Sequence, residues 1–447
     1  MPERLPPQST TRPNPRAVVV ALPPRDKPEE RVAASLAELR RLLRGLGVDV
    51  VHELVQRRDD ERAHLGPGKL RELARLTGGP GVVTRGPPGE AGSEPETETE
   101  PDAVPAAEPI ADLVVVDADL SPAEERRLAA ALGVDVMDRT GTILRVFERR
   151  AQTREAKIEI EMARLRHDVA RTREVVGVDD REGGGGRGER GHSNVELAKQ
   201  RMHKRLAELR RQLDAARSVR DRTRQRRDHV ASVALVGYTN AGKSSLMRGL
   251  THSEVLVDDL LFATLDTTVR AIPDTSPRVL VTDTVGFLED LPHDLIASFR
   301  STLEETAHAA LVLYVLDASD PRMQAHLRVT QEALADLGLR APSLVVLNKI
   351  DRVDPDTRAQ LHERFPDALA VSALDPGDVT RLREAIVAGL RAEMVEADLV
   401  VPYDRGELLG QLHAQAHVLH EDYGEAGVAV TVHARPEVLA RVRRALR

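Results

Sequence analysis

Eight residues near the middle of the chain, GYTNAGKS, combine two glycines with a lysine and a hydroxyl group. A run typical of a buried strand, ASVALVG, leads into them and a helical pattern, SLMRGL, follows, so the motif G-x-x-x-x-G-K-[ST] has its required setting. Gly237 and Gly242 allow backbone N–H groups to curl around phosphates. Lys243 brings a cation to the β and γ oxygens, and Ser244 binds magnesium. This pattern predicts binding of a nucleoside triphosphate with Mg²⁺; an ordinary glycine turn is the alternative.

A second segment, LVTDTVGF (280–287), places Asp283 at the end of another predicted strand, about forty residues after the phosphate loop. Asp283 can hold magnesium through water, and the Gly286 N–H can meet the γ-phosphate, which makes the following loop a nucleotide switch. A turn aspartate is the alternative. The predicted phosphate-binding residues are Gly237, Tyr238, Thr239, Asn240, Ala241, Gly242, Lys243, Ser244, Ser245, Asp283, Thr284, Val285 and Gly286.

A third segment, SLVVLNKID (343–351), follows the same design of a buried strand with polar residues at its end. A carboxylate acceptor at Asp351 suits guanine, whose N1–H and exocyclic amine both donate, whereas adenine offers no matching pair of donors. The later VSAL (371–374) predicts a loop whose Ala373 N–H points at guanine O6. A surface turn is the alternative. The predicted guanine-binding residues are Asn348, Lys349, Ile350, Asp351, Ser372, Ala373 and Leu374.

The threonine that closes over the nucleotide must lie between the phosphate loop and Asp283, within LFATLDTTVR (261–270). We select Thr264, because Thr267 and Thr268 are more typical of the start of the next strand. The predicted switch residues are Phe262, Ala263, Thr264, Leu265 and Asp266. The predicted magnesium ligands are Ser244, Thr264 and Asp283.

Phe287 occupies the position where many small GTPases have a glutamine that orients the attacking water. An apolar side chain cannot do this, so unassisted hydrolysis should be slow and a partner or an ion must complete the site. GTPases that combine Asn at the Asn240 position with an apolar residue here resemble one another in using potassium. Asn240 is therefore a candidate K⁺ ligand; a hydrogen bond within the loop is the alternative.

Alternating β-branched runs and helical patterns surround these motifs, and they predict a fold of class α/β. A P-loop GTPase domain at 229–395 is expected beside an N-terminal α/β domain at 1–150, a long antiparallel helical hairpin at 151–228 and a small C-terminal α+β unit at 396–447. In the N-terminal domain the predicted strands are 17–22, 48–55, 112–118 and 134–138, and the predicted helices are 29–46 and one capped by Ser121.

Two segments interrupt these patterns. Residues 78–110 are rich in Pro, Gly and Glu, which predicts a disordered insertion. Residues 181–194 are rich in glycine and form the predicted tip of the hairpin. Apolar residues at steps of three and four define the two arms of the hairpin: Ile158, Met162, Leu165 and Val169 in the first, and Met202, Leu206, Leu209, Leu213 and Ala216 in the second. In the C-terminal unit we expect a helix near 407–417, a strand at 427–433 and a helix from Pro436.

Composition excludes several classes of function. The 447 residues contain no cysteine, so disulfides and thiol chemistry are impossible. Neither a signal peptide nor an apolar membrane span is evident, and we expect a soluble, cytoplasmic monomer. The net charge of -8 conceals an acidic run at 90–108 and an arginine-rich stretch at 199–227. With only 2% aromatic residues, stacking on single-stranded nucleic acid is not a major device.

With these motifs placed, the whole chain resembles the HflX-type GTPases, a bacterial family. The similar stretches are HLGPGKLREL (64–73), DRTGTILRVFERRAQTREAKIEIEMARL (138–165), VGYTNAGKSSL (236–246), LFATLD (261–266) and TDTVGFLEDLPHDL (282–295). The resemblance implies Mg²⁺-dependent GTP hydrolysis to GDP and binding to the large (50S) ribosomal subunit and its rRNA, with splitting or rescue of stalled or idle ribosomes. Three features depart from the family pattern: Thr267 replaces a usual proline, the tip sequence differs, and the acidic run is extra.

A cationic second arm gives the ribosome interpretation separate support, since such a surface suits the backbone phosphates of folded RNA. A solvated coiled-coil face with partly compensating acids, such as Glu208, Asp214 and Asp221, is the alternative. For the whole protein, the alternative function is a GTP-dependent signalling switch that recruits a protein partner. The candidate RNA contacts are Arg187, Arg190, His192, Lys204, Arg205 and Arg211.

Overall fold

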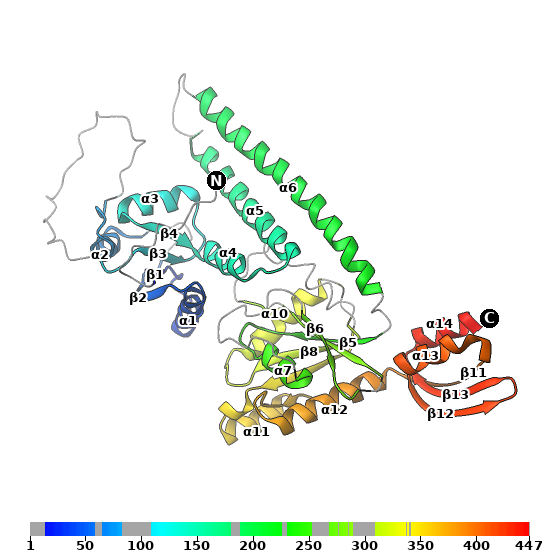
Figure 1. The fold of residues 1–447 in the computed structure, drawn as a ribbon. Coiled ribbons are helices and arrows are strands. Elements are labelled where there is room, and N and C mark those ends of the chain that lie inside the picture. Colours follow the sequence, from blue (N-terminus) through cyan, green and yellow to red (C-terminus); the bar gives the residue numbers. More distant parts are fainter. Residues whose placement is uncertain are drawn as a thin grey trace, which may run out of the picture. The chain divides into compact units, whose positions relative to one another are not determined.

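The computed structural model describes residues 14–58, 65–82, 109–179, 188–225, 230–252, 268–275, 277–284, 286–288, 309–336, 338 and 341–446. The chain divides into two compact units (Figure 1): Met1–Arg149 with Ile160–Glu208, and Arg150–Glu159 with Leu209–Arg447. Among the residues described, none of the helices is both long and apolar enough to cross a membrane.

The first unit contains a sheet of four parallel strands in the order β2-β1-β3-β4. This arrangement confirms the predicted alternation of strands and helices. The capping box at Ser121, in which the side chains of Ser121 and Glu124 bond each other's backbone N–H groups, starts α3, the helix predicted from Ser121. The elements are β1 (Arg16–Ala21), α1 (Glu29–Gly45), β2 (Asp49–Val55), α2 (Pro67–Thr77), β3 (Leu113–Asp117), α3 (Pro122–Leu132), β4 (Asp135–Asp138) and α4 (Arg139–Arg150).

The borders of the predicted insertion belong to this folded unit, because both make close contacts with its helices. A Cβ added to Gly79 would lie 2.2 Å from the Leu132 carbonyl carbon, and the Gly81 N–H donates to the Ala131 carbonyl over 2.8 Å. At the other border, the Ile110 N–H donates to the Leu76 carbonyl in the last turn of α2, over 2.9 Å. Both borders of the predicted 78–110 insertion are therefore folded, and residues 83–108 lie outside the described part.

Two long helices follow, α5 (Arg154–Asp179) and α6 (Gly188–Gln225). Arg205 Nε bonds Glu161 over 2.8 Å, and the later Arg217 bonds the earlier Glu159 over 3.3 Å, so the helices run antiparallel. Helix α6 begins inside the segment predicted as the tip, so the predicted end of the tip at 194 is corrected. Once a long helix has formed, adding a residue to it costs little free energy, even when that residue is glycine. The buried apolar residues are Ala156, Ile158, Ile160, Met162, Ala163 and Val169 in α5, and Leu209 and Leu213 in α6.

The second unit contains a six-stranded sheet in the order β10-β9-β8-β5-β7-β6, parallel except for the edge strand β6. Helices α7 and α12 cover one face, and α10 covers the other (Figure 1). Thr268 begins β6, as predicted. The elements are β5 (Ala231–Val236), α7 (Lys243–Thr251), β6 (Thr268–Ile272), β7 (Val279–Asp283), β8 (Leu311–Asp317), α10 (Met323–Ala335), β9 (Ser343–Asn348), α11 (Pro355–Arg364), β10 (Leu369–Ala370) and α12 (Pro376–Ala392).

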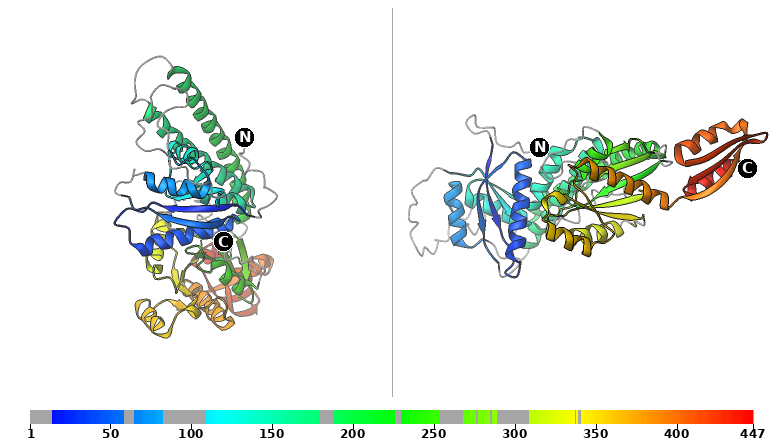
Figure 2. Two further views of the ribbon diagram at one scale, coloured as in Figure 1. Left: turned by 90° about the vertical axis from the view of Figure 1, so that its left-hand side faces the viewer. Right: turned by 90° about the horizontal axis from the view of Figure 1, so that it is seen from below.

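The chain ends in an antiparallel sheet of order β11-β13-β12, with helices on one face (Figure 2). Two predicted boundaries were wrong. The helix expected to reach His417 ends at Gln415, because His417 pairs with His433 in the sheet, and Val395, before the expected boundary at 396, pairs with Ala434. The elements are β11 (Val395–Val401), α13 (Gly406–Gln415), β12 (His417–Gly424), β13 (Gly427–Ala434) and α14 (Pro436–Leu446).

Candidate nucleotide-binding site

The loop between β5 and α7 lies at the carboxyl end of the central strand of the six-stranded sheet, where ligands bind in open α/β sheets. Two of its glycines are required by close backbone and side-chain neighbours. A Cβ on Gly237 would lie 2.2 Å from the Val315 carbonyl oxygen, and one on Gly242, whose φ is 94°, would lie 2.1 Å from Asn348 Nδ2. No other residue type fits either position, so the loop can curl tightly with its N–H groups facing a ligand.

The segment after β7 is hydrogen-bonded to this loop. The Thr239 N–H donates to the Phe287 carbonyl over 2.8 Å, and the Phe287 N–H donates to the Gly237 carbonyl over 3.1 Å. A Cβ on Gly286 would lie 2.8 Å from Thr239 Cα and 2.9 Å from Lys243 Nζ. The Gly286 backbone therefore approaches the phosphate loop and its lysine, at the place predicted from the motif spacing.

Lys243 is buried beneath the loop, and its ammonium group donates to the carbonyls of Gly237 and Tyr238 over 3.0 and 2.8 Å. Burial lowers the pKa of Lys243 to about 8, and the charge of Asp283 opposes this shift in part. A nearby phosphate would add negative charge and favour the ammonium form. The carbonyls hold this cation at the base of the loop, in reach of a bound polyphosphate.

A hydroxyl and a carboxylate meet beside that lysine. Ser244 Oγ donates to Asp283 Oδ2 over 2.7 Å, and Asp283 is fully buried at the end of β7. Hard oxygen donors of this kind suit magnesium, which is commonly held in proteins by one or two such groups together with substrate phosphates and water. The two side chains therefore fit a magnesium ion, which would neutralise phosphate charge when bound.

The base-side loops are connected to the phosphate loop through Asn348. Its Nδ2 donates to the Ala241 carbonyl over 2.8 Å, and its Oδ1 accepts from the Ala373 N–H over 3.1 Å. The N–H that we expected to point at guanine O6 is thus bonded to Asn348 in this structure. Asp351 and Leu374 are exposed beside these loops. The structure brings the predicted guanine residues together at the edge of the phosphate loop.

Asp317 is part of this arrangement, and the motif search missed it. The carboxylate ends β8 and accepts from Lys349 Nζ over 2.7 Å. Burial would raise the pKa of Asp317, but bonds from Lys349 and Ser319 outweigh it and hold that pKa below its usual value. Its signal in the sequence was an acidic residue directly after the buried run LVLYVL, the same position that Asp283 and Asn348 occupy on other strands.

An aromatic stack supports the loop from below, which the sequence did not indicate either. The rings of Tyr238 and His326, from α10, have centroids 3.7 Å apart and are nearly parallel. Phe287 is 5% exposed and belongs to the same apolar cluster as Tyr238. The residue at the usual glutamine position is therefore buried in the core as well as apolar.

Several predicted site residues make other contacts in this structure or lie outside the described part. The Thr284 hydroxyl donates to the Leu235 carbonyl over 2.7 Å, which occupies its side chain in the sheet. Arg205 is paired with Glu161 and Glu208. Ser245 lies in the first turn of α7. Val285, the switch residues 262–266 with the magnesium candidate Thr264, and the side chains of Arg187, Arg190 and His192 lie outside the described residues.

Three family models match parts of this chain. A family model described as "50S ribosome-binding GTPase" matches residues 232–349. The models "GTP-binding GTPase Middle Region" and "GTP-binding GTPase N-terminal" match 150–227 and 102–148. Among solved structures, a GTP-binding protein from Sulfolobus solfataricus in complex with GDP is 19% identical, with a TM-score of 0.45, over 84% of this chain and 99% of that one.

Two curated relatives named GTPase HflX are similar over long stretches. The protein from Escherichia coli K12 is 35% identical over 74% of this chain and 79% of its own. The protein from Gluconacetobacter diazotrophicus is 49% identical over 98% of this chain and 99% of its own. With that identity over almost the entire length, the chain belongs to the HflX family of GTPases, and it binds and hydrolyses GTP.

Proposed function

We propose that this GTPase binds the large ribosomal subunit and promotes the splitting or rescue of stalled and idle ribosomes. The observation that carries the proposal is a group of exposed cations on α6, within the segment predicted to be the second arm. Such a group can neutralise RNA backbone phosphates and release their counterions. The domain description "50S ribosome-binding GTPase" supports the same partner. The exposed cations are Arg201, Lys204, Arg210 and Arg211.

We further propose roles for the residues of the nucleotide site. The phosphate-loop N–H groups and Lys243 would bind the phosphates, while Ser244 and Asp283 would hold magnesium. Asp351 would accept from guanine, and Asn348 would keep the base loop against the phosphate loop. Because Phe287 is buried and apolar, no side chain at that position would orient the attacking water.

Ribosome splitting can be tested directly by sedimentation of intact ribosomes with protein and GTP. We expect separated subunits, and a many-fold rise in GTP hydrolysis when large subunits are added at low salt. Reversing the charge of Arg210 and Arg211 to Glu should weaken both effects and reduce their salt dependence. The matched control reverses two exposed arginines of α14, Arg443 and Arg444, and should behave as the unaltered protein. If large subunits do not accelerate GTP hydrolysis at low salt, the signalling switch is the favoured function.

Potassium is the second cofactor that we propose. Asn240 is exposed in the phosphate loop with φ at 62°, and no hydrogen bond to a described residue fixes its amide. Its oxygen is a suitable ligand for a hard monovalent cation, whose charge would stabilise the loose transition state. We expect faster hydrolysis in K⁺ than in Na⁺ at equal ionic strength, and loss of this difference in Asn240→Ala. Equal rates in the two salts would contradict the assignment.

A further inference from the structure

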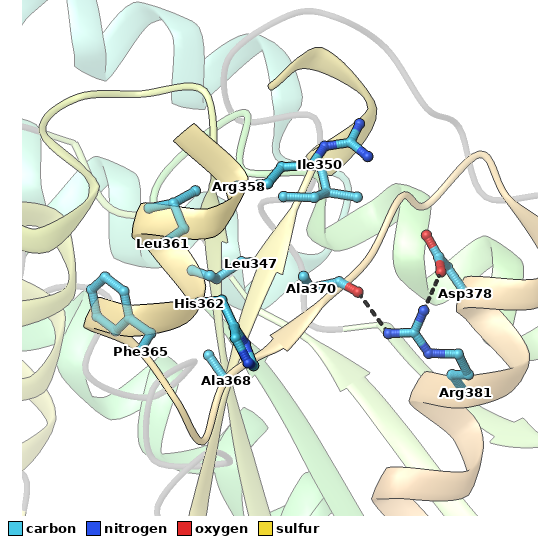
Figure 3. Close-up of a pocket in the computed structure, with 10 residues that line it drawn as sticks. All are labelled: Leu347, Ile350, Arg358, Leu361, His362, Phe365, Ala368, Ala370, Asp378 and Arg381. Carbon is cyan, nitrogen blue, oxygen red and sulfur yellow. Dashed lines mark hydrogen bonds and ion pairs between the residues drawn. The ribbon is translucent and has the colours of Figure 1, made fainter. Parts of the chain in front are cut away.

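Two side chains at the start of α12 hold the loop that we assign to the guanine base. The Ser372 N–H donates to Asp378 Oδ2 over 2.7 Å. Arg381 donates one Nη group to Asp378 Oδ1 over 2.9 Å and the other to the Ala370 carbonyl over 3.0 Å. Figure 3 shows Arg381 between these two acceptors. We call Asp378 and Arg381 the clasp: together they fix both the end of β10 and the loop that follows it.

The clasp is connected to the phosphate loop by hydrogen bonds and one peptide bond. Directly after the residue that Asp378 holds, the Ala373 N–H bonds Asn348, and Asn348 in turn bonds the Ala241 carbonyl. A shift of the Ser372 backbone would therefore also move the Ala373 N–H, which is the group expected to recognise guanine O6. This connection gives α12 a means of acting on nucleotide affinity without touching nucleotide.

The first alternative is that Asp378 merely stabilises the N-terminus of its helix, as acidic residues in a first turn do. That terminus already has a cap: Asp375 accepts from the Gly377 N–H over 2.7 Å and from the Asp378 N–H over 3.0 Å. The Asp378 carboxylate is instead directed to the Ser372 backbone and to Arg381. Its contacts are those of a group that positions the loop.

The clasp also forms one wall of a cavity of about 300 Å³ between α11 and α12 (Figure 3). Leu361 of α11, Phe365 directly after that helix, and Ala370 of β10 also line it. The Arg381 side chain is 55% exposed, whereas that of Asp378 is 19% exposed. Water therefore weakens the arginine's contribution more than the carboxylate's, because exposed ion pairs are worth little.

We propose that Asp378 and Arg381 are positioning residues that set the affinity and base selectivity of the GTP site. The inference depends on the proposed assignment of 372–374 to the base. Because the clasp acts on the base loop and not on the reacting phosphates, its loss should raise KM and leave kcat unchanged. Loss of selectivity should accompany this change, since a displaced N–H recognises O6 less well.

The test measures the affinity of each variant for GDP and for xanthosine diphosphate (XDP), its KM and kcat for GTP, and its melting temperature. Asp378→Ala should weaken GDP binding by about tenfold, which corresponds to one charge-assisted hydrogen bond. Arg381→Ala should weaken it by about two- to fivefold. Arg381→Lys should restore part of the loss, because it keeps the charge but not the two-pronged geometry. Asp378→Ala combined with Arg381→Ala should match Asp378→Ala alone.

Arg383→Ala is the matched control, an identical change two residues along the same helix, and should leave GDP affinity and selectivity as they were. The proposal is overturned if Arg381→Ala also leaves them unchanged, or if the clasp variants lower kcat instead of raising KM. Asp351→Asn tests the assignment of the base-binding loop separately from the role of the clasp. If it weakens GDP and admits XDP while the clasp variants do not, only the clasp is rejected. If it changes nothing, the base assignment fails and the clasp fails with it.

Discussion

The chain builds two sheets with parallel strands whose carboxyl ends carry charged side chains, and the two ends are completed in different ways. In the six-stranded sheet the central strand leads into a glycine loop that leaves N–H groups, Lys243, Ser244 and Asp283 around a common space. In the four-stranded sheet the first strand leads into Leu22, Pro23 and Pro24, and prolines supply no N–H. Two sheets of similar architecture therefore do not provide the same ligand-binding site.

The charges of the four-stranded sheet neutralise one another. Arg139 is 8% exposed in its side chain and is bonded to Asp117 over 2.8 Å, to Ser35 and to Glu38. Asp138, at the end of β4, accepts from the Gly141 N–H over 2.6 Å. A buried ion pair of this kind is costly to break and leaves few donors for a ligand. The comparison shows that backbone donors freed by glycine, and not charge alone, make the end of a sheet into a binding site.

The largest expected effect on GDP affinity comes from a single glycine of the phosphate loop and tests this comparison of the two sheets. Gly242→Ala would place a Cβ 2.1 Å from Asn348 Nδ2 in a left-handed conformation, so the loop and the base side must both move. We expect GDP affinity to fall by about a hundredfold or more, measured by fluorescence titration. Gly410→Ala, in helix α13 with nothing near the added Cβ, is the matched control and should instead stabilise slightly. Normal GDP binding by Gly242→Ala would show that the close contact is not required.

Local patterns predicted much of this molecule, because the relevant physics acts between neighbours in sequence. Buried strands, the helix cap at Ser121 and the phosphate loop each follow from residues within one short segment. The contacts missed by the sequence join distant positions instead. Gly79 meets Leu132, and Asp317 meets Lys349. Such pairs depend on how elements pack, which periodicity does not encode.

Some predicted helix and strand boundaries were wrong for a related reason. Helix α6 starts at Gly188 although glycine disfavours helices, because a long helix can extend through a weak residue. Strand β12 begins at His417, where a helical pattern had been expected to end, because β13 offers a pairing partner. In both places the tertiary setting decided between local preferences that differ by about 1 kcal/mol.

A second pair of substitutions separates the roles of two buried cations. Arg139→Met leaves Asp117 and Glu38 without their cation, so we expect the first unit to lose about 3–5 kcal/mol of stability while GDP affinity stays the same. Lys243→Met removes a cation whose pKa burial has already lowered to about 8. It should leave the melting temperature unchanged or raise it, and weaken GDP roughly tenfold to a hundredfold.

Calorimetry without nucleotide and GDP titration distinguish the two outcomes. The arginine variant should lower stability without changing GDP affinity, and the lysine variant should lower GDP affinity without lowering stability. The comparison breaks if Arg139→Met weakens GDP binding while the first unit still melts normally, because the four-stranded sheet would then take part in nucleotide binding.

The smallest effect concerns protonation at the closed end of the four-stranded sheet. Nε2 of His167, on α5, lies 3.5 Å from the buried Asp138 carboxylate. Burial alone would lower the pKa of His167, but the bond to Asp138 and the charges of Asp138, Asp168 and Asp119 outweigh it and raise the pKa above the usual value. A raised pKa means that this stabilisation is complete below about pH 6.5 and is lost as the pH rises through the folded pKa. His167→Gln should therefore cost under about 1 kcal/mol near pH 6 and less near pH 8.

Thermal unfolding of both proteins across this range measures the difference. Burial also raises the pKa of Asp168, so Asp168→Asn serves as the control. That variant should keep a histidine-dependent step, because the Asp138 contact remains, but the step should move to lower pH, because one of the charges that raise the pKa of His167 is lost. If His167→Gln and the unaltered protein differ equally at every pH, the histidine acts only by packing. The charges at this end of the four-stranded sheet would then stay the same over the whole pH range measured. The nucleotide site would differ from it, because there a buried cation is available to bind an anionic ligand.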